Sequence, residues 1–108
     1  MVVTTTEGVA GRRVQRSLGQ VFGLVVRSRG LGGNILALFR SLGGGEIHEY
    51  TRMLEDARRQ AIDRMVENAH AMGADGVVMM RLHSSELGQT MAEVVAYGTA
   101  VVLAPEEG

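Results

Sequence analysis

The stretch EIHEYTRMLEDARRQAIDRMVENAHAMG, residues 46–73, decides the fold because its apolar side chains recur with the period of an α-helix. Steps of three or four residues connect Ile47, Tyr50, Leu54, Ala57, Ala61, Met65, Ala69 and Met72. Gly73 follows this stripe, as glycine commonly follows the end of a helix. We therefore expect one amphipathic helix from Glu46 to Met72, roughly 40 Å long at a rise of 1.5 Å per residue.

The sequence before this helix has the patterns of two strands and of a shorter helix. Residues 1–6, MVVTTT, are rich in β-branched side chains, which favours a short strand. Residues 12–28 predict a second strand, in which Gly19 and Gly23 mark bulges, bends or close backbone approaches. We expect either one bent strand or two short ones here. Residues 30–45, GLGGNILALFRSLGGG, predict a short helix between glycine hinges.

Two further strands follow the long helix. They are predicted at residues 76–87, GVVMMRLHSSEL, and 91–103, MAEVVAYGTAVVL, joined around Gly88. The order strand, strand, helix, strand, strand predicts an α+β fold, a two-layer sandwich in which an antiparallel-rich β-sheet packs on one long helix. We expect a single domain over residues 1–108, because this length lies in the usual range of ~50–200 residues for one domain.

The last strand indicates which sheet face meets the helix. One of its faces has almost only small residues, namely Ala92, Val94, Ala96, Gly98, Ala100 and Val102. Because the helix stripe also contains several alanines, the helix is expected to lie close to this face. The opposite face is predicted to be uncovered and to contain Val77, Met79, Val95, Val101 and Leu103. An uncovered apolar face predicts contact with another copy of the chain.

Composition excludes several kinds of site. The chain has no cysteine, so it has neither a disulfide framework nor a thiolate metal site. No apolar run approaches the ~18 residues of a membrane-spanning helix, and Met1 is not followed by a secretory signal pattern. We therefore expect a soluble, cytoplasmic protein. All 11 basic residues are arginines, and together with the 15 glycines this is typical of high-GC bacterial genomes.

The charges are divided between the two halves of the chain. Residues 1–45 contain six arginines and one acidic residue, a net charge of +5. Residues 46–108 contain five arginines and eleven acidic residues, a net charge of −6, and the two halves together give −1. A chain divided in this way is electrostatically complementary to itself.

Arg12, Arg13 and Arg16 form the clearest basic group. In a regular strand Arg12 and Arg16 would share one face, which suits a half-exposed strand that meets the acidic helix of another copy. We favour this inter-subunit role. The alternatives are a solvated strand, and binding of an anionic ligand or nucleic acid. Nucleic acid fits poorly because the net charge is negative and only Phe22 is an aromatic neighbour.

The histidines do not form a metal-binding motif. His48, His70 and His83 fall in three separate segments, with no spacing that would place two imidazoles on one ion. We therefore predict no metal site within one chain. The alternative is a site on the axis of a ring, where copies of one histidine would meet, with His83 the favoured one.

The last two strands place polar residues on the sheet face away from the helix. In the strand pairing that sets Ser84 opposite Ala92, and therefore His83 opposite Glu93, this face gathers an acid, a base and a phenol. The members of this polar cluster are Arg81, His83, Glu93 and Tyr97. We expect them either to bind a ligand between subunits or to form a layer of inter-subunit salt bridges and hydrogen bonds. A register shift by one residue would separate them.

The residues also resemble a known family over nearly the whole chain. LGQVFG at 18–23, GADGVV at 73–78 and GTAVV at 98–102 are the most specific matching stretches. With them the chain resembles the YbjQ-like family, whose members are labelled as heavy-metal-binding without an established function. The resemblance implies a dodecin-like β-sheet with one long helix, assembled as a homopentameric ring. It implies no reaction, since none of these stretches is a catalytic motif.

The sequence as a whole favours an assembly over an activity. We predict a non-enzymatic homo-oligomeric ring that binds a small ligand or a metal ion where subunits meet. The alternative is an enzyme that uses the polar cluster for acid–base chemistry on a small substrate. The sequence identifies no catalytic residue and no cofactor. The expected partner is another copy of the chain, and neither nucleic acid nor a membrane is expected.

Overall fold

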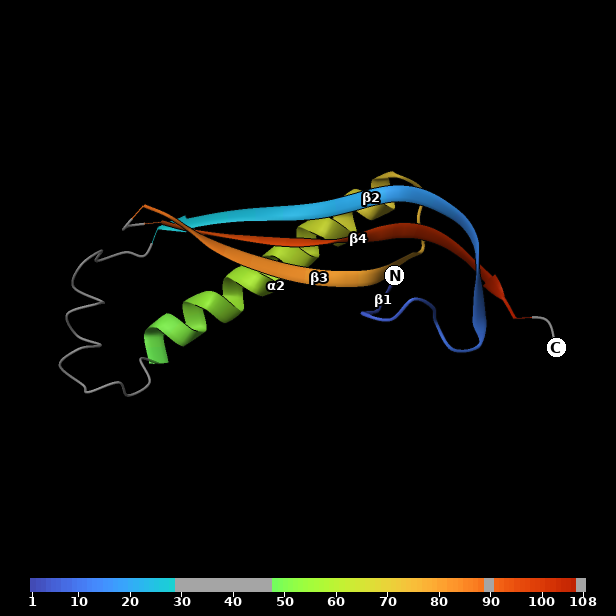
Figure 1. The fold of residues 1–108 in the computed structure, drawn as a ribbon, viewed down its shortest axis with the longest axis horizontal. Helices are drawn as coiled ribbons and strands as arrows, with labels where there is room; N and C mark the ends of the chain where they lie inside the picture. The colour runs from blue at the N-terminus through green and yellow to red at the C-terminus, as the bar shows by residue number, and fades with distance from the viewer. Residues whose placement is uncertain (29–47, 89–90, 107–108) are drawn as a thin grey trace.

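The computed structural model describes residues 1–28, 48–88 and 91–106. It contains the strands β1 (Val2–Val3), β2 (Arg12–Ser28), β3 (Gly76–Leu87) and β4 (Met91–Pro105), and the helix α2 (His48–Ala71). The strands form one four-stranded sheet in the order β1-β3-β4-β2, with β1 parallel to β3 and the other neighbours antiparallel (Figure 1). The predicted element order and the α+β class are confirmed. The short helix predicted within residues 30–45 lies outside the described residues.

The helix α2 covers one face of the sheet through a stripe of mostly small side chains (Figure 1). The buried members of the stripe are Ala57, Ala61, Met65 and Ala69, as the sequence predicts. They pack against Val21, Val25, Val94, Ala96 and Ala100 of β2 and β4. Met72 was expected on the same stripe but is exposed, because α2 ends at Ala71 and Gly73 turns the chain away with a φ of 88°.

Gly23 sets the distance between α2 and β2. A Cβ atom at this position would overlap the backbone carbonyl oxygen of Ala61 and the backbone nitrogen of Met65. Helix and strand therefore touch backbone to backbone, which only glycine allows. Of the roles that the sequence leaves open for Gly23, the close backbone approach is the one observed.

The strand β2 is one long bent strand, one of the two forms expected. Its pairing with β4 shifts register between Val14 and Arg16 and again between Ser17 and Gly19, where Gly19 has a φ of 112°. Each shift adds a residue to β2, which bends the strand. Figure 1 shows the result, since β2 and β4 curve together beyond the C-terminal end of α2.

The N-terminal segment covers part of the sheet face away from α2. β1 pairs with the start of β3, and Val2 and Val9 pack against Val78, Val101 and Leu103 in a second, smaller core. The prediction that this whole face is uncovered is therefore wrong at its Val101–Leu103 end. It is also wrong for Val77, which belongs to the core beneath α2. The cause is a bulge in β3 after Val78, which reverses the alternation of faces.

The described part of the chain is elongated. It measures 59 × 24 × 15 Å and has a radius of gyration of 17.5 Å. A compact domain of this length would have a radius of gyration of ~13 Å. Within the described ranges, no helix is both long and apolar enough to cross a bilayer.

Candidate functional site

The sheet face away from α2 is left uncovered beyond the N-terminal segment, and we call this uncovered part the open face. On β2 it consists of Gln20, Phe22, Leu24 and Val26. On β4 it consists of Met91, Glu93, Val95, Tyr97 and Thr99. On β3 it consists of Arg81, His83, Ser85 and Leu87. The open face is apolar along β2 and mostly polar along β3.

The apolar part of the open face is strongly exposed. The exposed fractions are 58% for Phe22, 48% for Val26, 45% for Tyr97 and 40% for Leu24. Met91 and Leu87, at the hairpin end of the same face, are also exposed. Large apolar side chains gathered in this way mark a surface that makes contact with something else.

The strand register of the β3–β4 hairpin differs by two residues from the register considered in the sequence analysis. Ser84 pairs with Val94, so the pairing of Ser84 with Ala92 is wrong. That pairing would have left only Gly88 between the strands, which is too short for a hairpin loop. The observed pairing of Leu87 with Met91 leaves three residues between the paired positions, and the first of them, Gly88, has a φ of 69°. Because the shift is an even number, the face of each residue is unchanged.

The members of the polar cluster therefore share the open face, but in different rows from those expected. Arg81 lies opposite Tyr97, and His83 lies opposite Val95 rather than opposite Glu93. Glu93 faces Ser85, whose hydroxyl donates a hydrogen bond of 3.0 Å to the carboxylate.

Arg81 is held by the backbone. Its Nη1 atom donates to the carbonyl oxygen of Thr5 at 2.9 Å and to that of Met80 at 2.8 Å. Arg81 thereby fastens the N-terminal segment to β3. His83 is exposed between Arg81 and Ser85 on the same strand. The structure thus brings the four residues to one surface, but within the described part of the chain no hydrogen bond joins them to one another.

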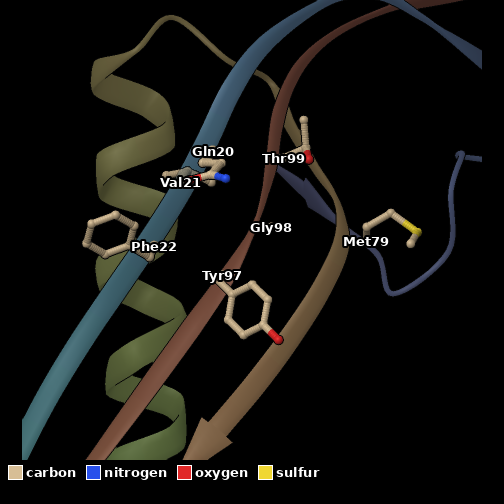
Figure 2. A pocket seen from close by; sticks show the side chains of 7 residues that line it. All are labelled: Gln20, Val21, Phe22, Met79, Tyr97, Gly98 and Thr99. Atoms are coloured by element: carbon tan, nitrogen blue, oxygen red, sulfur yellow. The ribbon is translucent and has the colours of Figure 1, made fainter.

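A hollow lies on the open face above Gly98 (Figure 2). Its volume is ≈ 370 Å³. The residues that line it are Gln20, Val21, Phe22, Met79, Tyr97, Gly98 and Thr99, from three strands. In Figure 2 the side chains of Tyr97 and Thr99 extend from β4 on either side of Gly98, with Met79 on β3 and Gln20 on β2. Sequence reasoning selected only Tyr97 from this set.

The bulge of β3 borders the hollow. Val78 pairs with Thr99 and Arg81 pairs with Tyr97, so Met79 and Met80 together oppose Gly98. Met79 has a φ of 56°, a left-handed conformation that side chains other than glycine rarely adopt. The run VVMM at 77–80 breaks the alternation of a half-buried strand, which is the sequence signal for this bulge.

The outer edge of β2 is covered by side chains of α2. Arg64 Nη1 donates to the carbonyl oxygen of Leu24 at 2.7 Å, and Asn68 Nδ2 donates to that of Phe22 at 2.8 Å. These bonds use carbonyl groups of an edge strand that would otherwise accept hydrogen bonds from a further strand.

Arg12, Arg13 and Arg16 are all exposed near the start of β2. The prediction that Arg12 and Arg16 share one face is wrong, because the bulge between Val14 and Arg16 adds one residue. Arg13 and Arg16 lie opposite Ala104 and Val102, on the α2 side of the sheet, and Arg12 lies on the other side.

The described residues of one chain do not fit a heavy-metal site. Within residues 1–28, 48–88 and 91–106, no three side chains of His, Asp or Glu come together in a way that could hold an ion. The whole sequence has no cysteine to supply the thiolate that soft metals prefer.

Comparison with known proteins places this sheet and helix in a family. The model of the YbjQ family, described as "Putative heavy-metal-binding", matches residues 1–104. The chain belongs to this family. The resemblance found in the sequence is thus confirmed.

Members of the YbjQ family with high identity come from both bacteria and archaea. A UPF0145 protein of Bradyrhizobium sp. (strain ORS 278) is 65% identical over 105 residues, which cover 97% of this chain and 95% of that protein. A UPF0145 protein of Methanoregula boonei is 52% identical over 108 residues, which cover 100% of this chain and 90% of that protein. The family is therefore not confined to bacteria.

A solved structure supports the fold. The crystal structure of a protein with unknown function from Pediococcus pentosaceus ATCC 25745 has a TM-score of 0.66 to this chain. The match covers 96% of this chain and 98% of the other, at 16% sequence identity. At that identity the likeness concerns the arrangement of sheet and helix alone.

Proposed function

We propose that this YbjQ-family chain is a non-enzymatic protein that assembles with copies of itself into a closed ring and holds a small ligand where subunits meet. Five subunits is the number that the sequence resemblance implies. A cytoplasmic location remains a prediction from the sequence.

The exposed apolar part of the open face carries this proposal. Phe22 and Val26 are 58% and 48% exposed, with Leu24 between them on β2. Tyr97 lies opposite Phe22 on β4. Leaving such side chains in water costs about 25 cal/mol for each Å² of apolar surface that a second copy would cover. The elongated shape also favours assembly, since a thin molecule has little interior of its own.

The bonds made by the polar cluster favour a structural role over acid–base catalysis. Arg81 is engaged by two backbone carbonyl groups, and Glu93 accepts a hydrogen bond from Ser85. Groups already bonded within the fold are less available to a substrate. A catalytic role for His83 with Glu93 is weakened further by their placement in different rows of the hairpin.

A metal ion at the subunit contacts would need ligands from several copies of the chain. His83 is the residue for such a site, because its exposed side chain lies on the open face. Elemental analysis of the untagged assembly tests this alternative. Less than one metal ion per ring would exclude it.

The test of the assembly is the mass of the native particle. Leu24→Glu places a charge in the middle of the open face, so we expect the dissociation constant of the assembly to rise at least about tenfold, or 1.4 kcal/mol. Native mass spectrometry and light scattering measure it.

Met72→Glu is the matched control. Met72 and Leu24 are both 40% exposed, but Met72 lies just after α2 and outside the open face. We expect this variant to keep the parent mass. A monomeric parent protein, or an intact multimer in the Leu24→Glu variant, would contradict the proposed surface.

A further inference from the structure

The hollow above Gly98 has the dimensions and the position of a ligand site. Its volume of ≈ 370 Å³ is within the range of about 300–1,000 Å³ that is typical of pockets for small molecules. Its lining comes from β2, β3 and β4, the three strands that form the open face.

The bulge of β3 determines where Met79 lies. Of the two residues that oppose Gly98, Met80 packs against the core beneath α2, whereas Met79 is 40% exposed at the hollow. Their backbone nitrogens donate to the carbonyl oxygens of Thr6 and Thr4, at 3.0 and 2.9 Å. The N-terminal segment therefore holds the bulge in place. Bulges are frequent beside functional sites, where they redirect a side chain.

The lining of the hollow has no formal charge. The nearest charged residue in the pairing is Arg81, opposite Tyr97, and its Nη1 is bonded to the carbonyl oxygens of Thr5 and Met80. An ionic ligand would therefore lose water without gaining a partner of opposite charge. The hollow selects for an uncharged molecule.

Two kinds of chemistry meet around the hollow. The ring of Tyr97 and the thioether of Met79 offer flat and polarisable contacts, which favour an aromatic ring. Gln20, Thr99 and the Tyr97 hydroxyl offer hydrogen-bonding groups. In the described part of the chain, none of these three side chains has a hydrogen bond to another residue. They are free to bind the polar edge of such a ring.

We propose that the hollow above Gly98 binds a small, uncharged, planar molecule with hydrogen-bonding groups on its edge, such as an aromatic amide or a neutral heterocycle. This inference names the ligand class for the small-ligand part of the proposed function and rests on it, but it does not depend on the number of subunits. Tyr97 and Met79 contact the plane of the molecule, and Gln20 and Thr99 bind its edge.

Three probes of similar size test the ligand class by NMR titration of the ¹⁵N-labelled full chain. Benzamide is planar, polar and uncharged. Benzoate has the same shape with a charge, and cyclohexanecarboxamide has the same amide without a planar ring. We expect benzamide to shift the amide signals of residues 20–22, 79 and 97–99, and the other two probes to bind at least about tenfold more weakly. Equal binding of all three, or shifts elsewhere, would overturn the proposal.

Substitutions test how much individual lining residues contribute to benzamide binding. We expect Tyr97→Leu to weaken benzamide binding at least fivefold and Thr99→Val at least twofold, on the order of the loss of one aromatic contact and one hydrogen bond. Thr5→Val is the control, because Thr5 lines a different depression beside Met80 and Leu82. Full affinity in Tyr97→Leu, in a sample whose spectrum shows an intact fold, would overturn the assignment.

Two further outcomes separate this inference from its alternatives. Tighter binding of a short single-stranded RNA than of benzamide at the same signals, weakening steeply with salt, would overturn the proposal in favour of a nucleic acid. The native mass of each sample is recorded in parallel. A monomer that binds benzamide at the hollow would refute the assembly and support the site, whereas a multimer without benzamide binding would refute the site alone.

Discussion

Met79 has an unfavourable backbone conformation that the contacts of the surrounding residues maintain. Its φ of 56° costs a residue with a Cβ about 1–2 kcal/mol. The surrounding structure maintains this conformation because Met80 fills the core and the backbone nitrogens of both residues are bonded to the N-terminal segment. The cost is therefore local, and substitution can measure it.

At position 79 glycine should be better tolerated than a β-branched residue. We expect Met79→Gly to be more stable than Met79→Val by about 1–2 kcal/mol, because valine is strained at positive φ and glycine is not. The same pair at Leu82 is the control, since Leu82 lies in the regular, paired part of β3 and is similarly exposed. There the order should reverse, with valine favoured. Urea unfolding at equal protein concentration measures the free energy of unfolding of all four variants. The same order of glycine and valine at both positions would contradict backbone strain at Met79.

At the scale of the elements, the packing of α2 on the sheet depends on small residues. Ala57, Ala61 and Ala69 are fully or almost fully buried, and Ala96 and Ala100 face them from β4. Gly23 is the closest of these contacts because no Cβ fits between β2 and the backbone of α2. In this packing, backbone atoms fix the distance between α2 and the sheet, because they cannot rotate away as a side chain can.

Gly23→Ala should therefore be costly. We expect a loss of about 3 kcal/mol in the free energy of unfolding, the upper end for overpacking, because the added methyl group meets backbone atoms of α2. Gly8→Ala is the control: a Cβ there has nothing within 4 Å and the φ of Gly8 is not in the positive region. Calorimetry measures the stability of both variants. A Gly23→Ala protein as stable as Gly8→Ala would show that α2 and β2 are not in backbone contact at Gly23.

At the scale of the whole molecule, the separation of charge is reflected in the structure. Arg12, Arg13 and Arg16 lie on the part of β2 that projects beyond α2, whereas Glu55, Asp56, Asp63 and Glu67 are exposed along α2. The basic end of one copy and the acidic helix of another are complementary surfaces. The bulge places Arg13 and Arg16 on the α2 side of the sheet and Arg12 on the other, so different contacts are expected for them.

The proposed assembly should accordingly depend on salt. We expect dissociation to increase between about 0.05 M and about 1 M NaCl, because screening shortens the range of these attractions from roughly 14 Å to about 3 Å. The triple variant Arg12→Gln, Arg13→Gln, Arg16→Gln should lose most of this dependence. Arg58→Gln with Arg59→Gln, which removes positive charge from the acidic helix instead, should retain it. Sedimentation velocity gives the masses, and an assembly indifferent to salt would refute the role of these arginines.

The sequence by itself determined the elements and the core beneath the helix. The helical stripe from Ala57 to Ala69 repeats every 3.6 residues, and the small residues of β4 repeat every 2. Both periods can be recognised without knowing what the residues contact. The close approach at Gly23 and the bend at Gly19 were also within reach of the sequence, since glycine inside a strand has few other uses. The family likeness adds to this reading and agrees with it.

Only the tertiary structure decided where the polar and apolar residues of the open face meet. The bulges at Met79 and before Arg16 reverse the alternation of faces. The run VVMM at 77–80 hints at the first of them, but which residues share a face after an insertion is fixed only by the pairing with the partner strand. The cover that the N-terminal segment gives to Val101 and Leu103 is likewise non-local. A surface hollow made by three strands depends on all of these pairings together, so the residues around Gly98 could be assembled only by the fold.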